Sequence, residues 1–105
     1  MGEVVTLCQR DKLASGEAQR FDVAGHRIAL VRIGEDFYAI GDRCSHANYS
    51  LSEGEVYPED KEIECWKHGS TFSLETGEAL SLPATKPVPV YEIVLEGDEV
   101  KVVLP

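Results

Sequence analysis

Apolar residues recur along this chain in short alternating runs, each closed by residues that favour turns. Residues 26–33 and 37–40 are joined by Gly34-Glu35-Asp36, a pattern typical of a β-hairpin. A second hairpin is predicted from residues 88–96 and 100–104, with Gly97-Asp98 as its turn. Further strands are predicted at residues 3–8, 17–23, 54–57, 62–65 and 71–74.

No long segment has the 3.6-residue period of an α-helix, and the best helical candidate is a turn or two at residues 12–16. Short strands with frequent turns are typical of an antiparallel all-β sandwich or barrel. At 105 residues and 43% hydrophobic content, we expect one folded domain over residues 1–105.

Two loop-like segments combine cysteine with histidine. Cys44-Ser45-His46 and Cys65-Trp66-Lys67-His68 are separated by the eighteen residues 47–64. Two predicted strands and their turns occupy that interval, so the second segment can return beside the first. Three cysteines cannot all be paired in disulfides, and cysteines at close spacing with histidine are typical of metal sites. From the residues alone, both a 2Fe–2S cluster and a zinc ion fit the donors.

The two ligand types have different effects on a 2Fe–2S centre. Four thiolates give the oxidised site a charge of about −2, whereas two thiolates and two neutral imidazoles leave it near 0. Because an electron is added more easily to a neutral site, histidine ligation raises the potential. The expected range is roughly −150 to +300 mV, compared with about −400 mV for plant-type ferredoxins.

These motifs, Cys44-x-His46 and Cys65-x-x-His68-Gly69-Ser70-x-Phe72, resemble the Rieske family, and the resemblance spans essentially the whole chain. It implies a 2Fe–2S cluster with both cysteines on one iron and both histidines on the other. Ser70 is expected to donate a hydrogen bond to a bridging sulfide. The proline-bearing residues 82–87 resemble the loop that covers such clusters. The order and short gaps of these ligands are unusual for zinc.

Departures from the family pattern indicate a low potential. High-potential members carry two further cysteines joined as a disulfide in the ligand loops, and here residues 47–49 and 66–67 contain none. High-potential members also have a tyrosine two residues after the loop serine, where this chain has Phe72. We therefore expect a midpoint potential below zero.

The resemblance is closest to soluble Rieske-type ferredoxins of aromatic-ring dioxygenase systems. It implies a one-electron carrier, not an enzyme, between an NAD(P)H-dependent flavoprotein reductase and a terminal non-haem iron oxygenase. The 105 residues are too few for an oxygenase large subunit. The alternative is a redox-sensing or iron–sulfur-assembly module. The small nitrite-reductase subunit, which shares the fold without the ligands, is disfavoured because all four ligands are present.

The chain is acidic, with 10 Lys and Arg against 19 Asp and Glu, a net charge of −9 and a pI near 4.7. Nucleic acid and anionic membranes are therefore excluded as partners. The acid excess either steers the protein to a basic patch on a partner or forms a solvated surface. No apolar run of 18 residues and no signal pattern occur, so we expect a cytoplasmic protein. We also expect it to be a monomer.

Other residues carry weaker expectations. Cys8 is expected to be a small buried hydrophobe, and His26 a surface residue that binds no metal. Trp66 and Tyr49 are expected to pack locally, with a place on the cluster shield or the partner face as the alternative. Lys67 is either solvated or paired with an acid of the partner.

Overall fold

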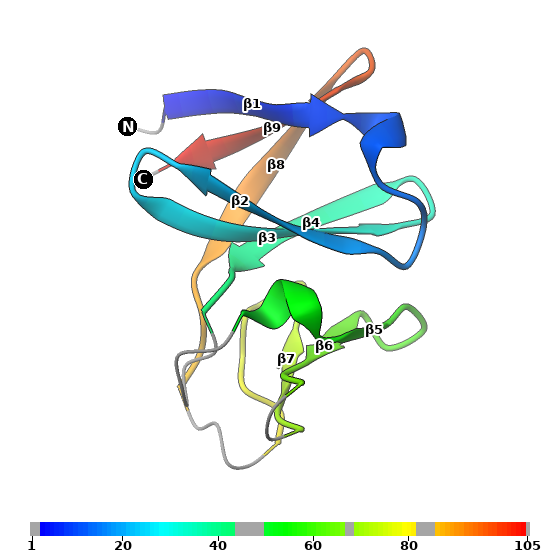
Figure 1. Cartoon of the computed structure of the whole chain (residues 1–105), viewed down its shortest axis with the longest axis vertical. Helices are drawn as coiled ribbons and strands as arrows, with labels where there is room; N and C mark the ends of the chain where they lie inside the picture. Colours follow the sequence, from blue (N-terminus) through cyan, green and yellow to red (C-terminus); the bar gives the residue numbers. More distant parts are fainter. Residues whose placement is uncertain (1–2, 44–49, 67–68, 82–85, 105) are drawn as a thin grey trace.

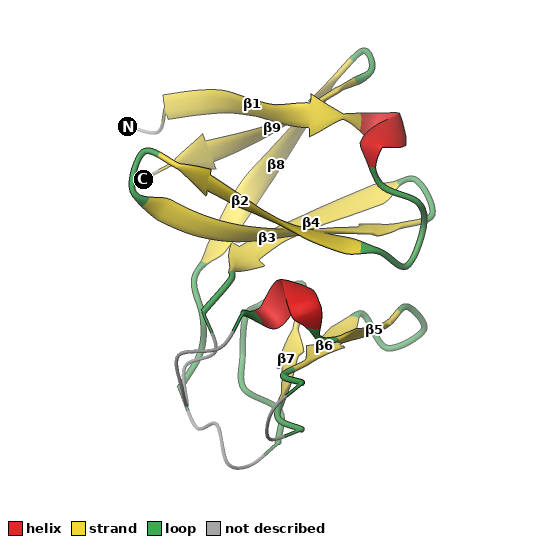
Figure 2. Cartoon of the chain, in the orientation of Figure 1, coloured by secondary structure: helices red, strands yellow, loops and turns green. Residues whose placement is uncertain are grey.

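The computed structural model describes residues 3–43, 50–66, 69–81 and 86–104, and it has the expected all-β antiparallel fold (Figures 1 and 2). Six strands form a curled base sheet in the order β1-β9-β8-β4-β3-β2. Their bounds are β1 Glu3–Gln9, β2 Ala18–Val23, β3 His26–Ile33, β4 Asp36–Gly41, β8 Val90–Glu96 and β9 Glu99–Leu104.

Hairpin turns set the register of the base sheet. In the β2–β3 hairpin, Val23 pairs with His26, and both turn residues have positive φ, 48° at Ala24 and 82° at Gly25. Such turns match the right-handed twist of the strands that they join. The turn at Gly97 is equally tight, because Glu96 pairs directly with Glu99.

A small three-stranded sheet is inserted between β4 and β8, in the order β5-β6-β7. Its strands are β5 Glu55–Tyr57, β6 Glu62–Glu64 and β7 Thr71–Ser73, preceded by the 3-10 helix η2, Leu51–Glu53. The entry and exit of this insertion are held together, since Gly41 N donates to Pro89 O at 2.8 Å. Figure 1 shows the small sheet below the base sheet, connected through these two chain segments.

The two faces of β3 serve two different cores. Ile28 and Leu30 point into the curled base sheet, whereas Ala29 and Val31 face the insertion. Successive strand residues point to opposite faces, so a strand buried on both sides reads as continuously apolar. Residues 28–31 of this strand are therefore buried on both sides of the sheet. The core between the sheets consists of Ala29, Val31, Ile40, Leu51, Ile63, Cys65, Phe72, Leu74 and Val88.

Most strands differ from their predicted bounds by one residue at an end, and larger differences occur in three places. The helical turn lies at η1, Arg10–Lys12, just before the predicted residues 12–16. Within the predicted loop before β5, Leu51 begins the turn η2 and is fully buried. Strand β8 begins at Val90, not at Val88, because Val88 still packs in the core of the insertion. No helix among the described residues is long and apolar enough to cross a membrane.

Candidate functional site

The second cysteine segment is a tight loop that leaves the core and re-enters it. Cys65 follows β6 and is completely buried, and Ser70 precedes β7 and is also completely buried. Cys65 N donates to Ser70 O at 2.6 Å, and Gly69 N donates to Cys65 O at 2.9 Å. Gly69 has φ 78°, a conformation that glycine adopts without strain. Trp66, which directly follows the buried Cys65, is 50% exposed, so the loop passes from core to surface within one residue.

The ends of the first cysteine segment are held together by Asp42 and its neighbours. Leu51 N donates to Asp42 O at 2.5 Å, and Ser52 N donates to Asp42 Oδ1 at 2.9 Å. An isolated bridge joins Arg43 to Ser50. Asp42 is 1% exposed and its N donates to the β3 carbonyl of Arg27 at 2.9 Å. These bonds anchor both ends of residues 44–49 to the base sheet.

The role of Asp42 was not predicted from the sequence. Its side-chain Oδ2 is buried without a hydrogen-bond partner among the described residues, and Arg20 Nε lies 3.9 Å away. An aspartate that binds backbone N–H groups nearby is a common turn device. This preference of aspartate for turns is the only sequence feature that points to Asp42, and it does not show which of the acidic residues is buried.

The flanks of the two cysteine segments pack directly on each other at Gly54. A Cβ built on Gly54 would overlap the carbonyl oxygen of Glu64, the residue immediately before Cys65. Leu51 and Cys65 also belong to the same buried cluster. The expectation that the second segment returns beside the first is confirmed for these described flanks.

The proline-bearing segment is fixed at both ends. At its start, Ser81 Oγ accepts from Thr71 N at 2.9 Å, which ties it to β7. At its end, Val88 N donates to Gly77 O at 2.8 Å. Pro83 and the rest of residues 82–85 lie outside the described residues.

Of the predicted ligands, Cys65 alone lies within the described residues; Cys44, His46 and His68 lie outside them, as do Tyr49 and Lys67. Consistent with this, the described part of the chain contains no group of three or more His, Cys, Asp or Glu that could bind a metal. The donor that is described fits a cluster, because Cys65 carries a free thiol in an apolar, water-excluded environment. Soft thiolates are the ligands that iron–sulfur clusters take.

The interior around Cys65 bears on the reduction potential. Phe72 is fully buried in the same core as Cys65 and offers no hydroxyl. We expect Phe72→Tyr to raise the midpoint potential by about 40 mV, since a hydrogen bond contributes about 1 kcal/mol net and favours the reduced cluster. Protein-film voltammetry measures this shift.

Phe37→Tyr is the matched control for that substitution, because Phe37 is buried in the core of the base sheet instead. It should leave the potential unchanged. A Phe72→Tyr protein with the parental midpoint, or a lower one, would show that position 72 does not reach the cluster.

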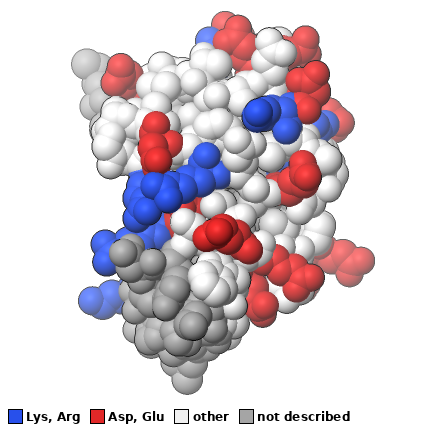
Figure 3. All heavy atoms as spheres, in the orientation of Figure 1, with Lys and Arg blue, Asp and Glu red and all other residues white. Residues whose placement is uncertain are grey.

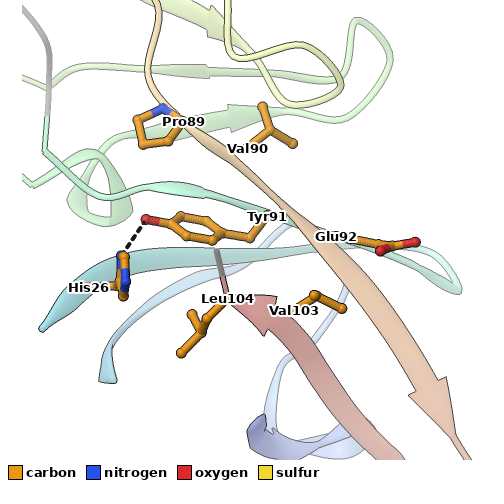
Figure 4. Close-up of a pocket in the computed structure, with 7 residues that line it drawn as sticks. All are labelled: His26, Pro89, Val90, Tyr91, Glu92, Val103 and Leu104. Carbon is orange, nitrogen blue, oxygen red and sulfur yellow. Dashed lines mark hydrogen bonds between the residues drawn. The ribbon is translucent and has the colours of Figure 1, made fainter. Parts of the chain in front are cut away.

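The third histidine belongs to a pocket on the base sheet (Figure 4). His26 Nδ1 lies 3.2 Å from Tyr91 Oη, and the two rings meet edge to face at 5.7 Å. Burial raises the pKa of the Tyr91 phenol, so this hydroxyl stays protonated at neutral pH. His26 is half-buried in this pocket, not a surface residue as expected, and its ring contacts the Tyr91 hydroxyl.

Cys8 is half-buried, not fully buried as expected. It packs against the core of the base sheet at a register shift in β1, and burial raises the pKa of its thiol.

Comparison with known proteins gives the same picture over almost the whole chain. The model of the family described as the Rieske [2Fe-2S] domain matches residues 3–92. The chain is 45% identical over 101 residues to the 3-phenylpropionate/cinnamic acid dioxygenase ferredoxin subunit of Shigella boydii serotype 4 (strain Sb227). That alignment covers 96% of this chain and 93% of the relative.

The fold also matches solved structures of ferredoxins. The ferredoxin of carbazole 1,9a-dioxygenase from Nocardioides aromaticivorans IC177 superposes with a TM-score of 0.92 at 38% identity, covering 97% of each chain. A chain from a complex of reduced oxygenase and oxidized ferredoxin in carbazole 1,9a-dioxygenase gives a TM-score of 0.88 at 35% identity. That match covers 94% of this chain and 91% of the other.

Proposed function

This chain belongs to the Rieske [2Fe-2S] domain family, and we propose that it is the ferredoxin component of an aromatic-ring dioxygenase system. It is an electron carrier and not the catalytic enzyme. The observation that carries this proposal is the match to ferredoxin subunits over 96% of this chain and 93% of the relative. It transfers electrons from an NAD(P)H-dependent flavoprotein reductase to a terminal oxygenase.

Its cofactor is a 2Fe–2S cluster, which accepts and releases one electron at a time. We propose that Cys44 and Cys65 ligate one iron and that His46 and His68 ligate the other. The burial of Cys65 supports a thiolate end turned to the core. The exposure of Trp66 and Gly69, on either side of Lys67 and His68 in the sequence, supports a histidine end near the surface. We propose that Ser70, which is buried at the end of this loop, donates a hydrogen bond to the cluster.

The chain's own residues keep this centre in one geometry. Asp42 anchors the first ligand segment, the Cys65–Ser70 hydrogen bond closes the second, and Thr71 with Ser81 fixes the third. A rigid surrounding changes little between redox states, which favours fast electron transfer. Trp66 and Leu80, 50% and 46% exposed, supply apolar contacts for the electron-transfer partner at this end. We further propose a monomeric, single-domain, cytoplasmic protein.

Reconstitution tests the function. Purified protein replaces the ferredoxin in the dioxygenase system of the Shigella boydii relative, with that system's reductase and oxygenase. We expect NADH oxidation coupled to hydroxylated product. A sensor or assembly module would give neither reduction by the reductase nor product, and that outcome would contradict the carrier role.

A matched pair of variants makes the reconstitution specific. His68→Ala should abolish coupled turnover, because it removes a proposed ligand. Lys12→Gln, on η1 of the base sheet, should support turnover at the parental rate. If the His68→Ala protein sustains turnover equally well, the electron does not travel through the proposed centre.

A further inference from the structure

Charge is distributed unevenly along this acidic chain. The three ligand and cover segments, taken as residues 43–52, 65–74 and 79–91, contain Arg43, Lys67 and Lys86 and no acidic residue. All 19 aspartates and glutamates lie in the rest of the sequence. The net charge of −9 therefore describes the body of the protein and not the segments that surround the cluster.

The fold adds further cations next to these segments. In the strand register of the β2–β3 hairpin, Arg27 lies opposite Asp22, and Arg20 lies opposite Ala29. Residues of a pair share a face of the sheet, and Ala29 faces the insertion, so Arg20 and Arg27 lie on that same face. Arg27 O accepts from Asp42 N, so Arg27 lies next to Asp42, the residue that precedes Arg43 in the chain. Figure 3 shows blue gathered next to the undescribed region, while red is spread over much of the remaining surface.

These arginines differ in how far their charge is balanced. Arg20 binds Asp22 through Nε at 3.1 Å, and this hydrogen bond raises the pKa of the Arg20 side chain. Arg27 and Arg43 are exposed, and neither forms an ion pair with another described residue. The described surface beside the ligand segments thus exposes two arginines, Arg27 and Arg43, that form no ion pair with a described residue. The nearby carboxylates of Asp22 and Asp42 lie 3.1 Å and 3.9 Å from Arg20 Nε.

We propose that the basic surface formed by Arg27 and Arg43 is a recognition surface for an acidic region of the protein partner that exchanges electrons with the cluster. This inference rests on the proposed function, because it takes the ligand segments as the end at which electrons leave. Of the two alternatives for the acid excess, it favours a solvated surface over one that steers the protein to a basic patch on a partner.

Screening by salt explains why the charge near the ligand segments affects docking more than the net charge of the whole protein does. At about 0.1 M salt, charges beyond about 10 Å are largely screened from each other. A partner docking at the ligand segments therefore senses the nearby arginines and lysines more than the distant acids. Charges placed in this way raise the rate of encounter and fix the orientation of docking more than they raise affinity.

Small charged oxidants test the sign of this surface without a partner protein. The reduced protein is mixed in a stopped-flow instrument with ferricyanide, a trianion, or hexaamminecobalt(III), a trication. One electron passes from the reduced cluster to the complex, which becomes ferrocyanide or the cobalt(II) complex. The ferricyanide rate constant should fall about fivefold as ionic strength rises from about 0.02 to about 0.2 M, and the cobalt rate constant should rise.

Charge-reversal variants show which residues attract ferricyanide to the reduced protein. Arg27→Glu and Arg43→Glu should each lower the ferricyanide rate at low salt by about threefold to fivefold. Lys12→Glu makes the same change of net charge at η1 and should alter the rate by less than about twofold. The midpoint potential of each variant is measured alongside, so that a change in driving force is separated from a change in encounter.

Two results would overturn the proposal. The first is a wild-type ferricyanide rate that rises with salt, as the net charge alone predicts. The second is an equal response of Arg43→Glu and Lys12→Glu. Visible absorption recorded before mixing separates these from failure of the proposed function, since a protein without the cluster would have no chromophore, and that absence would overturn both.

Discussion

Replacing His46 or His68 with alanine is expected to abolish the visible chromophore and reductase-coupled reduction. A 2Fe–2S cluster needs four side chains, and alanine at one position leaves an iron open to solvent. The expected iron and sulfide content is close to zero. Absorption spectra together with chemical analysis of iron and acid-labile sulfide measure the loss directly.

His26→Ala is the matched control, because the chain has three histidines and His26 is held by Tyr91 on the base sheet. Its variant should retain a full cluster. The ligand assignment would be wrong if the His68→Ala protein kept its chromophore and full iron content. It would also be wrong if His26→Ala lost the cluster while remaining folded.

Gly54→Ala is expected to destabilise the protein by about 3 kcal/mol, since the added methyl would overlap the Glu64 carbonyl oxygen and force the backbone apart. In a protein of this size that corresponds to a melting temperature lower by roughly 10–20 °C. Thermal unfolding followed by circular dichroism gives the melting temperature. The separated strands flank Cys65, so the cluster content of the variant should fall as well.

Gly97→Ala separates this steric effect from backbone strain. Gly97 has φ 59°, and a Cβ there would meet no atom within 4 Å, whereas Gly54 has φ −83°. Gly97→Ala should therefore cost only the left-handed strain, about 1 kcal/mol, and keep the cluster. Equal melting temperatures for the two variants would mean that the approach of Gly54 to Glu64 is not needed for stability.

Sequence patterns were sufficient for the strands of the base sheet. The bounds of β3 agree with the prediction of residues 26–33, and Gly97-Asp98 forms the predicted turn between β8 and β9. Alternation and turn residues are local signals, so one sequence contains them. The start of β8 was predicted too early, because Val88 and Tyr91 pack in different cores and the alternation does not show where the chain passes between them.

Residues that position the ligand segments could not be found in this way. Gly54 is required by a carbonyl ten residues further along the chain, and Asp42 by the backbone N–H of Ser52. Both roles arise from tertiary contacts between segments that have no periodic pattern. The ligand assignment stays a prediction. It rests on Cys-x-His and Cys-x-x-His in one chain, a rare combination of donors with a specific chemistry.

The most direct test of the account is electron–nuclear double resonance on the dithionite-reduced protein with ¹⁵N-labelled histidine. A cluster held by two cysteines and two histidines predicts a paramagnetic signal coupled to two imidazole nitrogens. A signal without nitrogen coupling would indicate ligation by cysteine alone. A diamagnetic protein containing zinc and no iron would contradict the electron-carrier function altogether.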